Sequence, residues 1–91
     1  MARREARIIE AGGERFRFYY DADLPEVLHI VLRHGTTPEE AIRTFFGGET
    51  GPWNDDRARF ETVSDTHHRY WTRHAHDQSV IVISCFARQE V

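Results

Sequence analysis

The chain has 91 residues, 40% of them hydrophobic and 30% charged, which is typical of one small globular domain and excludes a disordered or fibrous protein. Its formal net charge of −3 excludes an obligate nucleic-acid binder that relies on a basic surface. No apolar run approaches the roughly 20 residues that span a membrane, no signal peptide is recognisable, and a single cysteine allows no internal disulfide. These features predict a cytoplasmic protein, one domain over residues 1–91, without membrane association.

All twelve basic residues are arginines. One interpretation is the base composition of the genome. The other is function, because a guanidinium group binds phosphate or carboxylate through two parallel hydrogen bonds. Only the positions of the arginines in the fold can separate the two.

The first predicted element is a β-hairpin. Residues 6–11 have the character of a strand, Gly12-Gly13 is a favourable two-residue turn, and residues 15–20 form the returning strand. In the returning strand arginines alternate with phenylalanines, and this period of two is typical of a strand with one buried face and one solvent-exposed face.

A helix is predicted to follow over residues 23–34. Asp23 is placed to cap it, Glu26 completes a capping box, and Gly35 ends it. The side chains predicted to face the core are Leu24, Val27, Leu28, Val31 and Leu32.

A second helix is predicted over residues 37–46. Thr37 and Glu40 repeat the capping box, and Gly47-Gly48 ends the helix. Its predicted apolar stripe consists of Ala41, Ile42, Phe45 and Phe46.

The rest of the chain is predicted to contain a loop and three strands. Residues 47–56 are loop by composition, residues 57–64 and 69–76 are polar strands, and residues 79–87 are an apolar run that suits a central strand covered on both faces. The order ββ-αα-βββ predicts an α+β fold, an antiparallel sheet with two short helices packed on one face.

The histidines are the first candidates for chemistry. If residues 67–76 are extended, His68, His74 and His76 share one face of the strand, and Arg69, Trp71 and Arg73 share the other. Such histidines could bind zinc, could simply be solvated, or could act as acid–base or phosphate-contacting groups. The spacing predicts no particular metal ligands.

Three other residues have structural interpretations. His34 precedes the glycine that ends the first helix, where a donor side chain complements the exposed carbonyls. His29 lies near the apolar stripe of the same helix. Cys85 lies inside the apolar strand and is expected to behave as a small hydrophobic residue.

The order of motifs resembles that of BrnT-type toxins. The N-terminal part of the resemblance is carried by Phe18-Tyr19-Tyr20-Asp21, His29-Ile30-x-x-Arg33-His34-Gly35 and Thr37-Pro38-Glu39-Glu40-Ala41. The C-terminal part is carried by Arg59-Phe60, Thr72-Arg73 and Ile83-Ser84, and the whole covers roughly residues 16–90. The resemblance implies a RelE-like fold, ribonuclease activity and inhibition by a partner antitoxin.

The chain departs from the family pattern at one functional position. The family motif Ile-Ser-Ala-Arg reads Ile83-Ser84-Cys85-Phe86 here, so that a phenylalanine stands where the family has arginine. Arg88 lies two residues further on, on the same face of the strand if the strand continues, and could substitute.

Two hypotheses of function follow. In the first, the chain cleaves RNA without a metal or cofactor: Arg59, Arg73 and Arg88 hold the phosphate, and His74 or His68 moves the proton. Its partners would be an RNA substrate and an antitoxin protein. In the second, the same fold is a non-catalytic interaction module that acts through a homodimer or a protein partner.

Overall fold

The chain begins with the hairpin that the Gly-Gly pair predicts. In the computed structural model, which describes residues 5–88, β1 (Ala6–Ala11) and β2 (Glu14–Tyr19) pair antiparallel. Gly12 and Gly13 connect them with φ angles of 58° and 80°, the left-handed conformation that such a turn requires. A Cβ on Gly12 would also lie 2.6 Å from the ring of Phe46, so a side chain at this position would require that exposed ring to move.

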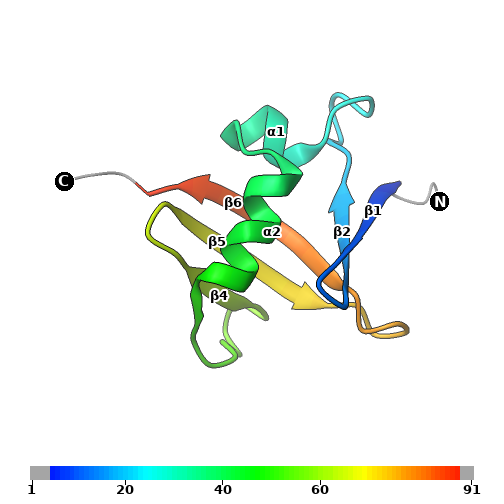
Figure 1. Ribbon diagram of the computed structural model, residues 1–91. Coiled ribbons are helices and arrows are strands. Elements are labelled where there is room, and N and C mark those ends of the chain that lie inside the picture. Colours follow the sequence, from blue (N-terminus) through cyan, green and yellow to red (C-terminus); the bar gives the residue numbers. More distant parts are fainter. Residues whose placement is uncertain (1–4, 89–91) are drawn as a thin grey trace.

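The sheet is mixed and has six strands, so the predicted purely antiparallel sheet with five strands is wrong. The strand order is β1-β2-β6-β5-β4-β3, and β2 runs parallel to β6 (Figure 1). The additional strand is β3, two residues long, within a segment predicted to be loop. The strands after the helices are β3 (Glu49–Thr50), β4 (Phe60–Val63), β5 (His67–Arg73) and β6 (Val80–Ala87).

The two polar strands exist, but their boundaries differ from the prediction. Strand β4 begins at Phe60 rather than at residue 57, because Ala58 adopts a left-handed φ of 53°. Strand β5 ends at Arg73, because the chain turns back where the His74 N–H donates to the Ser79 carbonyl and Gln78 has a φ of 61°. His74 and His76 therefore lie in the turn, and the predicted face shared with His68 does not form.

The first helix is shorter than predicted. Helix α1 (His29–His34) begins six residues after Asp23, and residues 22–27 form turns instead. The cause is Asp21, whose buried carboxylate accepts hydrogen bonds from the N–H groups of Asp23 and Leu24. Among the side chains predicted to face the core, Leu24, Val31 and Leu32 are exposed, and only Leu28 is fully buried.

The second helix confirms its capping box. In α2 (Pro38–Gly47) the Thr37 Oγ1 accepts from the Glu40 N–H at 3.2 Å, and the Glu40 carboxylate accepts from the Thr37 N–H at 3.0 Å. Ala41 is buried as predicted, whereas Phe46 is 51% exposed and lies over the hairpin turn.

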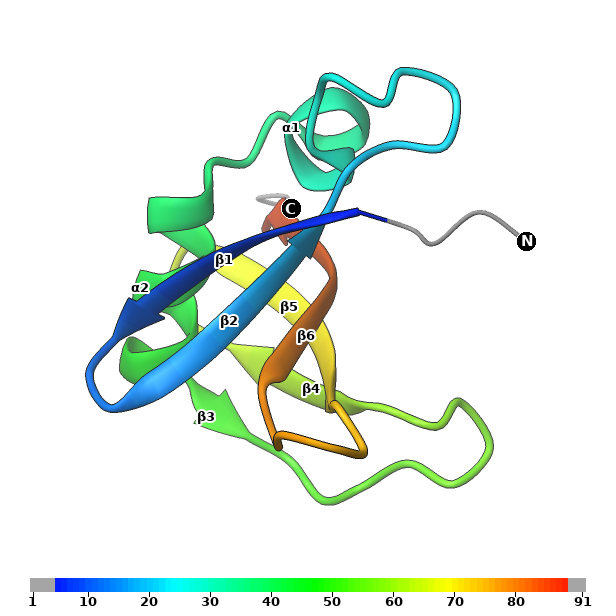
Figure 2. The ribbon, with the colours of Figure 1, turned by 90° about the vertical axis from the view of Figure 1, so that its right-hand side faces the viewer.

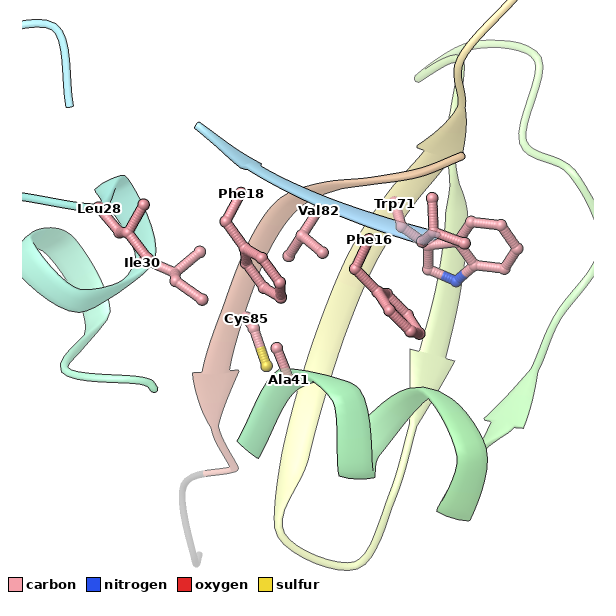
Figure 3. Packing of buried hydrophobic residues seen from close by; sticks show 9 residues of the cluster. Phe16, Phe18, Leu28, Ile30, Ala41, Trp71, Val82 and Cys85 are labelled. Carbon is pink, nitrogen blue, oxygen red and sulfur yellow. The ribbon is translucent and has the colours of Figure 1, made fainter. Parts of the chain in front are cut away.

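The core lies between α2 and one face of the sheet. Figure 3 shows Ala41 of α2 facing Phe16, Cys85 and the sheet, while Leu28 and Ile30 enter from the side of α1. Figure 2 shows the long β1–β2 hairpin lying beside β6. Helix α1 packs mainly on β6, next to the end of β2, so that it borders the sheet rather than covering it in the way α2 does.

Strand β6 is central, as predicted, but only one of its faces is covered. Val80, Val82 and Cys85 are buried in the core, and Ile83 is 38% exposed. Ile83 is a bulge residue, since its neighbours pair with Trp71 and Tyr70 while it has no partner in the register with β5. The opposite side of the sheet, here called the open face, is not covered by α2. Among residues 5–88, neither helix is long and apolar enough to cross a membrane.

Candidate functional site

The open face carries a cluster of rings centred on Phe86. The imidazole of His68 stacks on Phe86 with centroids 5.6 Å apart and 16° between the ring planes. Tyr70 and His34 contact the same ring at 5.8 and 5.9 Å. We call these four side chains the aromatic platform.

Strand geometry brings these rings together. His68 and Tyr70 are two residues apart on β5, so they project from the same face, opposite to the buried side chains of Arg69 and Trp71. The bulge at Ile83 shifts the alternation of β6 by one residue, which turns Phe86 to the same face as His68.

His34 joins the platform from α1. It is the last residue of that helix, and Gly35 ends the helix in the left-handed conformation with a φ of 64°. Partial burial, together with the neighbouring imidazole of His29, lowers the pKa of His34. A greater fraction of His34 is therefore neutral at physiological pH than for a free histidine, as a general base requires.

Charged groups flank the platform on the side of β4. The Glu61 carboxylate lies 3.1 Å from Nδ1 of His68 and orients that ring. The guanidinium carbon of Arg59 lies 3.7 Å above the centroid of the Tyr70 ring, a cation–π contact. The predicted site residues Arg59 and His68 are thus brought together through Tyr70 and Phe86.

Arg88 lies at the end of the sheet where His68 pairs with Phe86. Its backbone N–H donates to Thr66 and its Nη1 donates to the Ser64 carbonyl at 3.2 Å, both in the segment that joins β4 to β5. His68 pairs with Phe86 across β5 and β6, so this end is also where the platform lies. The exposed guanidinium of Arg88 adds positive charge near the rings.

The structure does not bring Arg73 and His74 to the platform. Arg73 pairs with Val80 at the opposite end of β5, projects from the face that contains Trp71, and binds the Glu14 carboxylate through two hydrogen bonds. His74 lies in the turn after β5, with Nδ1 3.5 Å from Asp77. Within residues 5–88, no three or more His, Cys, Asp or Glu side chains are grouped so that they could hold a metal ion.

A third histidine, His29, lies beside the platform and contacts a buried carboxylate. Nδ1 of His29 is 3.1 Å from Asp21, and the rings of His29 and His34 are 5.9 Å apart. The guanidinium of Arg33 binds both oxygens of Asp21 and, with the N–H of Asp23, holds the pKa of Asp21 far below its usual range. Asp21 is therefore a fixed anion that orients His29.

Sequence reasoning missed most of the platform. Of its four rings, the sequence pattern predicts a site role for His68 alone; Phe86 stands at the position of a family arginine, and His34 has the position of a helix-end residue. The spacing of His68 and Tyr70 would have placed both on one face, but the bulge that adds Phe86 leaves no signal in the sequence.

Neither a family model, nor a curated protein, nor a solved structure was found to match this chain. The function of the chain is therefore inferred from the arrangement of side chains on the open face.

Proposed function

We propose that this chain is a small ribonuclease that cleaves RNA by metal-independent acid–base chemistry at the aromatic platform. The observation that carries the proposal is that two imidazoles, His34 and His68, contact one ring, Phe86, on an accessible sheet face. The resemblance to BrnT-type toxins adds a partner antitoxin that would neutralise the activity.

The chemistry requires two groups that move protons. One imidazole removes the proton of the ribose 2′-OH, and the 2′-oxygen then attacks the adjacent phosphorus atom. The bond from phosphorus to the 5′-oxygen breaks as the second imidazole gives that oxygen a proton. The products are a 2′,3′-cyclic phosphate and a free 5′-OH.

We assign the base role to His34 and the acid role to His68. The lowered pKa of His34 favours its neutral form. In the imidazolium form of His68, Nδ1–H donates to Glu61 and Nε2–H is left to deliver its proton to the 5′-oxygen. Arg59 lies over the Tyr70 ring and Arg88 lies beside the segment that joins β4 to β5, and both would stabilise the charge that develops on the phosphate.

The platform also supplies a surface for bases. Aromatic rings bind unstacked bases regardless of sequence, at about 1–3 kcal/mol per base. Such stacking adds affinity that the net charge of −3 does not provide.

The test is cleavage of single-stranded RNA by the purified protein in the presence of EDTA. His68→Gln and His34→Gln should each lower the rate on the order of 10²–10⁴-fold without loss of folding. His76→Gln, in the exposed turn after β5, is the matched control and should retain full activity. A chain that never cuts RNA, or one in which all three variants cut equally, would contradict the proposal.

The pH profile gives a second readout. If His34 is the base, the rate rises with pH as this group loses its proton, and the midpoint of the rise lies below 6.5 because its pKa is lowered. His34→Gln should remove this limb of the profile. A rise with its midpoint well above 6.5 would exclude His34 as the base.

One observation favours the non-catalytic alternative, an interaction module. Leu24, Val31 and Leu32 are all exposed around α1, and apolar side chains gathered on a surface mark sites of protein contact. Expression in a bacterial host, with and without the neighbouring small gene, separates the two functions. Growth arrest that the neighbour relieves supports the toxin, and unaffected growth in both cases supports the module.

A further inference from the structure

A small cavity opens beside the aromatic platform, between the end of β2, helix α1 and β6. Its volume is about 270 Å³, and its walls include Tyr19, His29, Ile81 and Ile83. The core residue Phe18 lies at its base. Ligand pockets usually measure about 300–1,000 Å³, so this cavity suits a single planar ring system rather than a whole nucleotide.

The cavity exists because two strands separate there. Strand β2 pairs with β6 only as far as Phe18 and Val82. The next residue of β6 is the bulge Ile83, which has no partner in the register with either neighbouring strand. Tyr19 and Ile81 alternate with buried neighbours, which directs them to the open face. The cavity therefore opens on the same face as the platform.

One wall of the cavity carries an oriented hydrogen-bonding group. Asp21 is buried and ionised, so it accepts the hydrogen bond from Nδ1 of His29. In the neutral imidazole, Nε2 is then the acceptor. His29 is 34% exposed and lines the cavity, where Nε2 can accept a bond from an N–H group of a ligand.

We infer that this cavity receives one unstacked nucleobase of single-stranded RNA, an inference that rests on the proposed ribonuclease function. The walls offer a base apolar surface from Ile81 and Ile83, an aromatic ring from Tyr19, and an acceptor for a base N–H from His29. Recognition of RNA commonly uses this combination, a splayed base held by apolar contact and hydrogen-bonded at its edge.

The position along β6 supports the same conclusion. Ile83 is three residues from Phe86, a distance of about 10 Å along a strand at about 3.3 Å per residue. His29 contacts His34, and His34 contacts Phe86, so the cavity and the platform are joined by a continuous row of rings. A base in the cavity would fix the register of the RNA relative to the two imidazoles, and so the bond that is cut.

The experiment is an NMR titration of the full chain with adenosine and guanosine, and separately with ribose 5-phosphate. The nucleosides should shift the amide signals of Tyr19, His29 and Ile83, and ribose 5-phosphate should not. Shifts confined to His68, Tyr70 and Phe86 would overturn the inference, because the base would then stack on the platform alone. Absence of any shift at saturating nucleoside would overturn it as well.

Two matched variants extend the test to RNA cleavage. Ile83→Trp fills the cavity, and Ile8→Trp makes the same change at an exposed isoleucine of β1. Ile83→Trp should weaken nucleoside binding at least tenfold and change which bond of a mixed-sequence RNA is cut, whereas Ile8→Trp should do neither. If the chain cuts RNA at the same bonds in both variants, the cavity does not hold a base. If it cuts no RNA but nucleosides still bind at Ile83, the proposed function fails and the base site remains.

Discussion

Phe86 and His68 are stacked across β5 and β6, with ring centroids 5.6 Å apart and 16° between their planes. The two residues are cross-strand partners near the end of the sheet, which places an imidazole and a benzyl ring side by side on the accessible face. The relationship exists because a bulge residue precedes Phe86 by three positions and reverses the face from which it projects.

Phe86→Leu should weaken RNA binding while the protein stays folded. Leucine preserves apolar contact with His68 but removes the flat ring, and base stacking is worth about 1–3 kcal/mol. We expect about a tenfold loss of affinity or more for a 2′-O-methyl RNA, measured by fluorescence anisotropy. Phe46→Leu, an exposed phenylalanine of α2, is the control and should bind normally. Equal affinities for the two variants would remove Phe86 from the binding surface.

Asp21→Asn should lower the melting temperature at neutral pH, and the melting temperature of this variant should fall less than that of the parent as the pH is lowered. The folded-state pKa of Asp21 is depressed by Arg33, so this carboxylate contributes stability above its ordinary pKa of about 4 that is lost as the pH falls toward the folded value. Melting curves followed by circular dichroism from pH 7 down to pH 2 measure this. Asp23→Asn, which removes an exposed partner of Arg33, should change little. Identical pH profiles for the two variants would show that Asp21 does not anchor this segment.

Arg69→Met should stabilise the domain. Arg69 is completely buried, its Nη1 donates to the Ala41 carbonyl, and Nε and Nη2 are buried without a partner among the described residues. Replacing a buried charge with an apolar side chain of similar length is often neutral or stabilising by about 1–4 kcal/mol. Chemical denaturation measures the free energy of unfolding. Arg69→Ala, which leaves a cavity, should destabilise instead.

The buried Arg69 also predicts how the stability of the fold depends on pH in the alkaline range. Burial lowers the pKa of Arg69 to about 9, so the folded chain binds this proton less tightly than the unfolded chain does. As the pH increases above that value, the free energy of unfolding of the parent should therefore rise relative to that of Arg69→Met. A melting temperature of Arg69→Met below that of the parent would mean that the guanidinium is a net stabiliser, through its position 4.8 Å from the Phe45 ring.

The ion pair between Arg73 and Glu14 should contribute to the free energy of unfolding and not to catalysis. Their bidentate ion pair joins β2 to the end of β5, at N–O distances of 3.0 and 3.1 Å, and it lowers the pKa of Glu14. A double-mutant cycle with Arg73→Ala and Glu14→Gln should give a coupling energy of about 0.2–1 kcal/mol that diminishes with salt. RNA cleavage should persist in both variants. Loss of cleavage in a fully folded Arg73→Ala would return Arg73 to the active site.

Val82→Asp should prevent folding. Val82 is 4% exposed on the covered face of β6, and an unpaired buried carboxylate costs several kcal/mol. The adjacent Ile83→Asp, at a 38% exposed bulge residue, should melt cooperatively close to the parent. A cooperative transition in Val82→Asp near that of the parent would mean that β6 does not form the centre of the core.

Local interactions explain what could be predicted from the sequence. The Gly12-Gly13 turn, the capping box of Thr37 and Glu40, and the apolar strand after residue 79 depend on neighbours a few positions away, and all three appear where predicted. A local pattern also misplaces the start of the first helix, which lies at His29 and not next to Asp23. Asp23 has the local pattern of a cap, but Asp21 captures its N–H because Arg33 and His29 hold the Asp21 carboxylate in place.

Long-range pairing decided the rest. The sequence alone determined an α+β domain with two helices and a central apolar strand, because periodicity and capping are encoded within a few residues. Only the tertiary structure decided that β2 runs parallel to β6. It also decided that Glu14 pairs with Arg73, which is 59 positions away in the sequence, and that the bulge at Ile83 turns Phe86 toward His68. These contacts depend on the register between distant strands, and a shift of one residue would move each side chain to the other face.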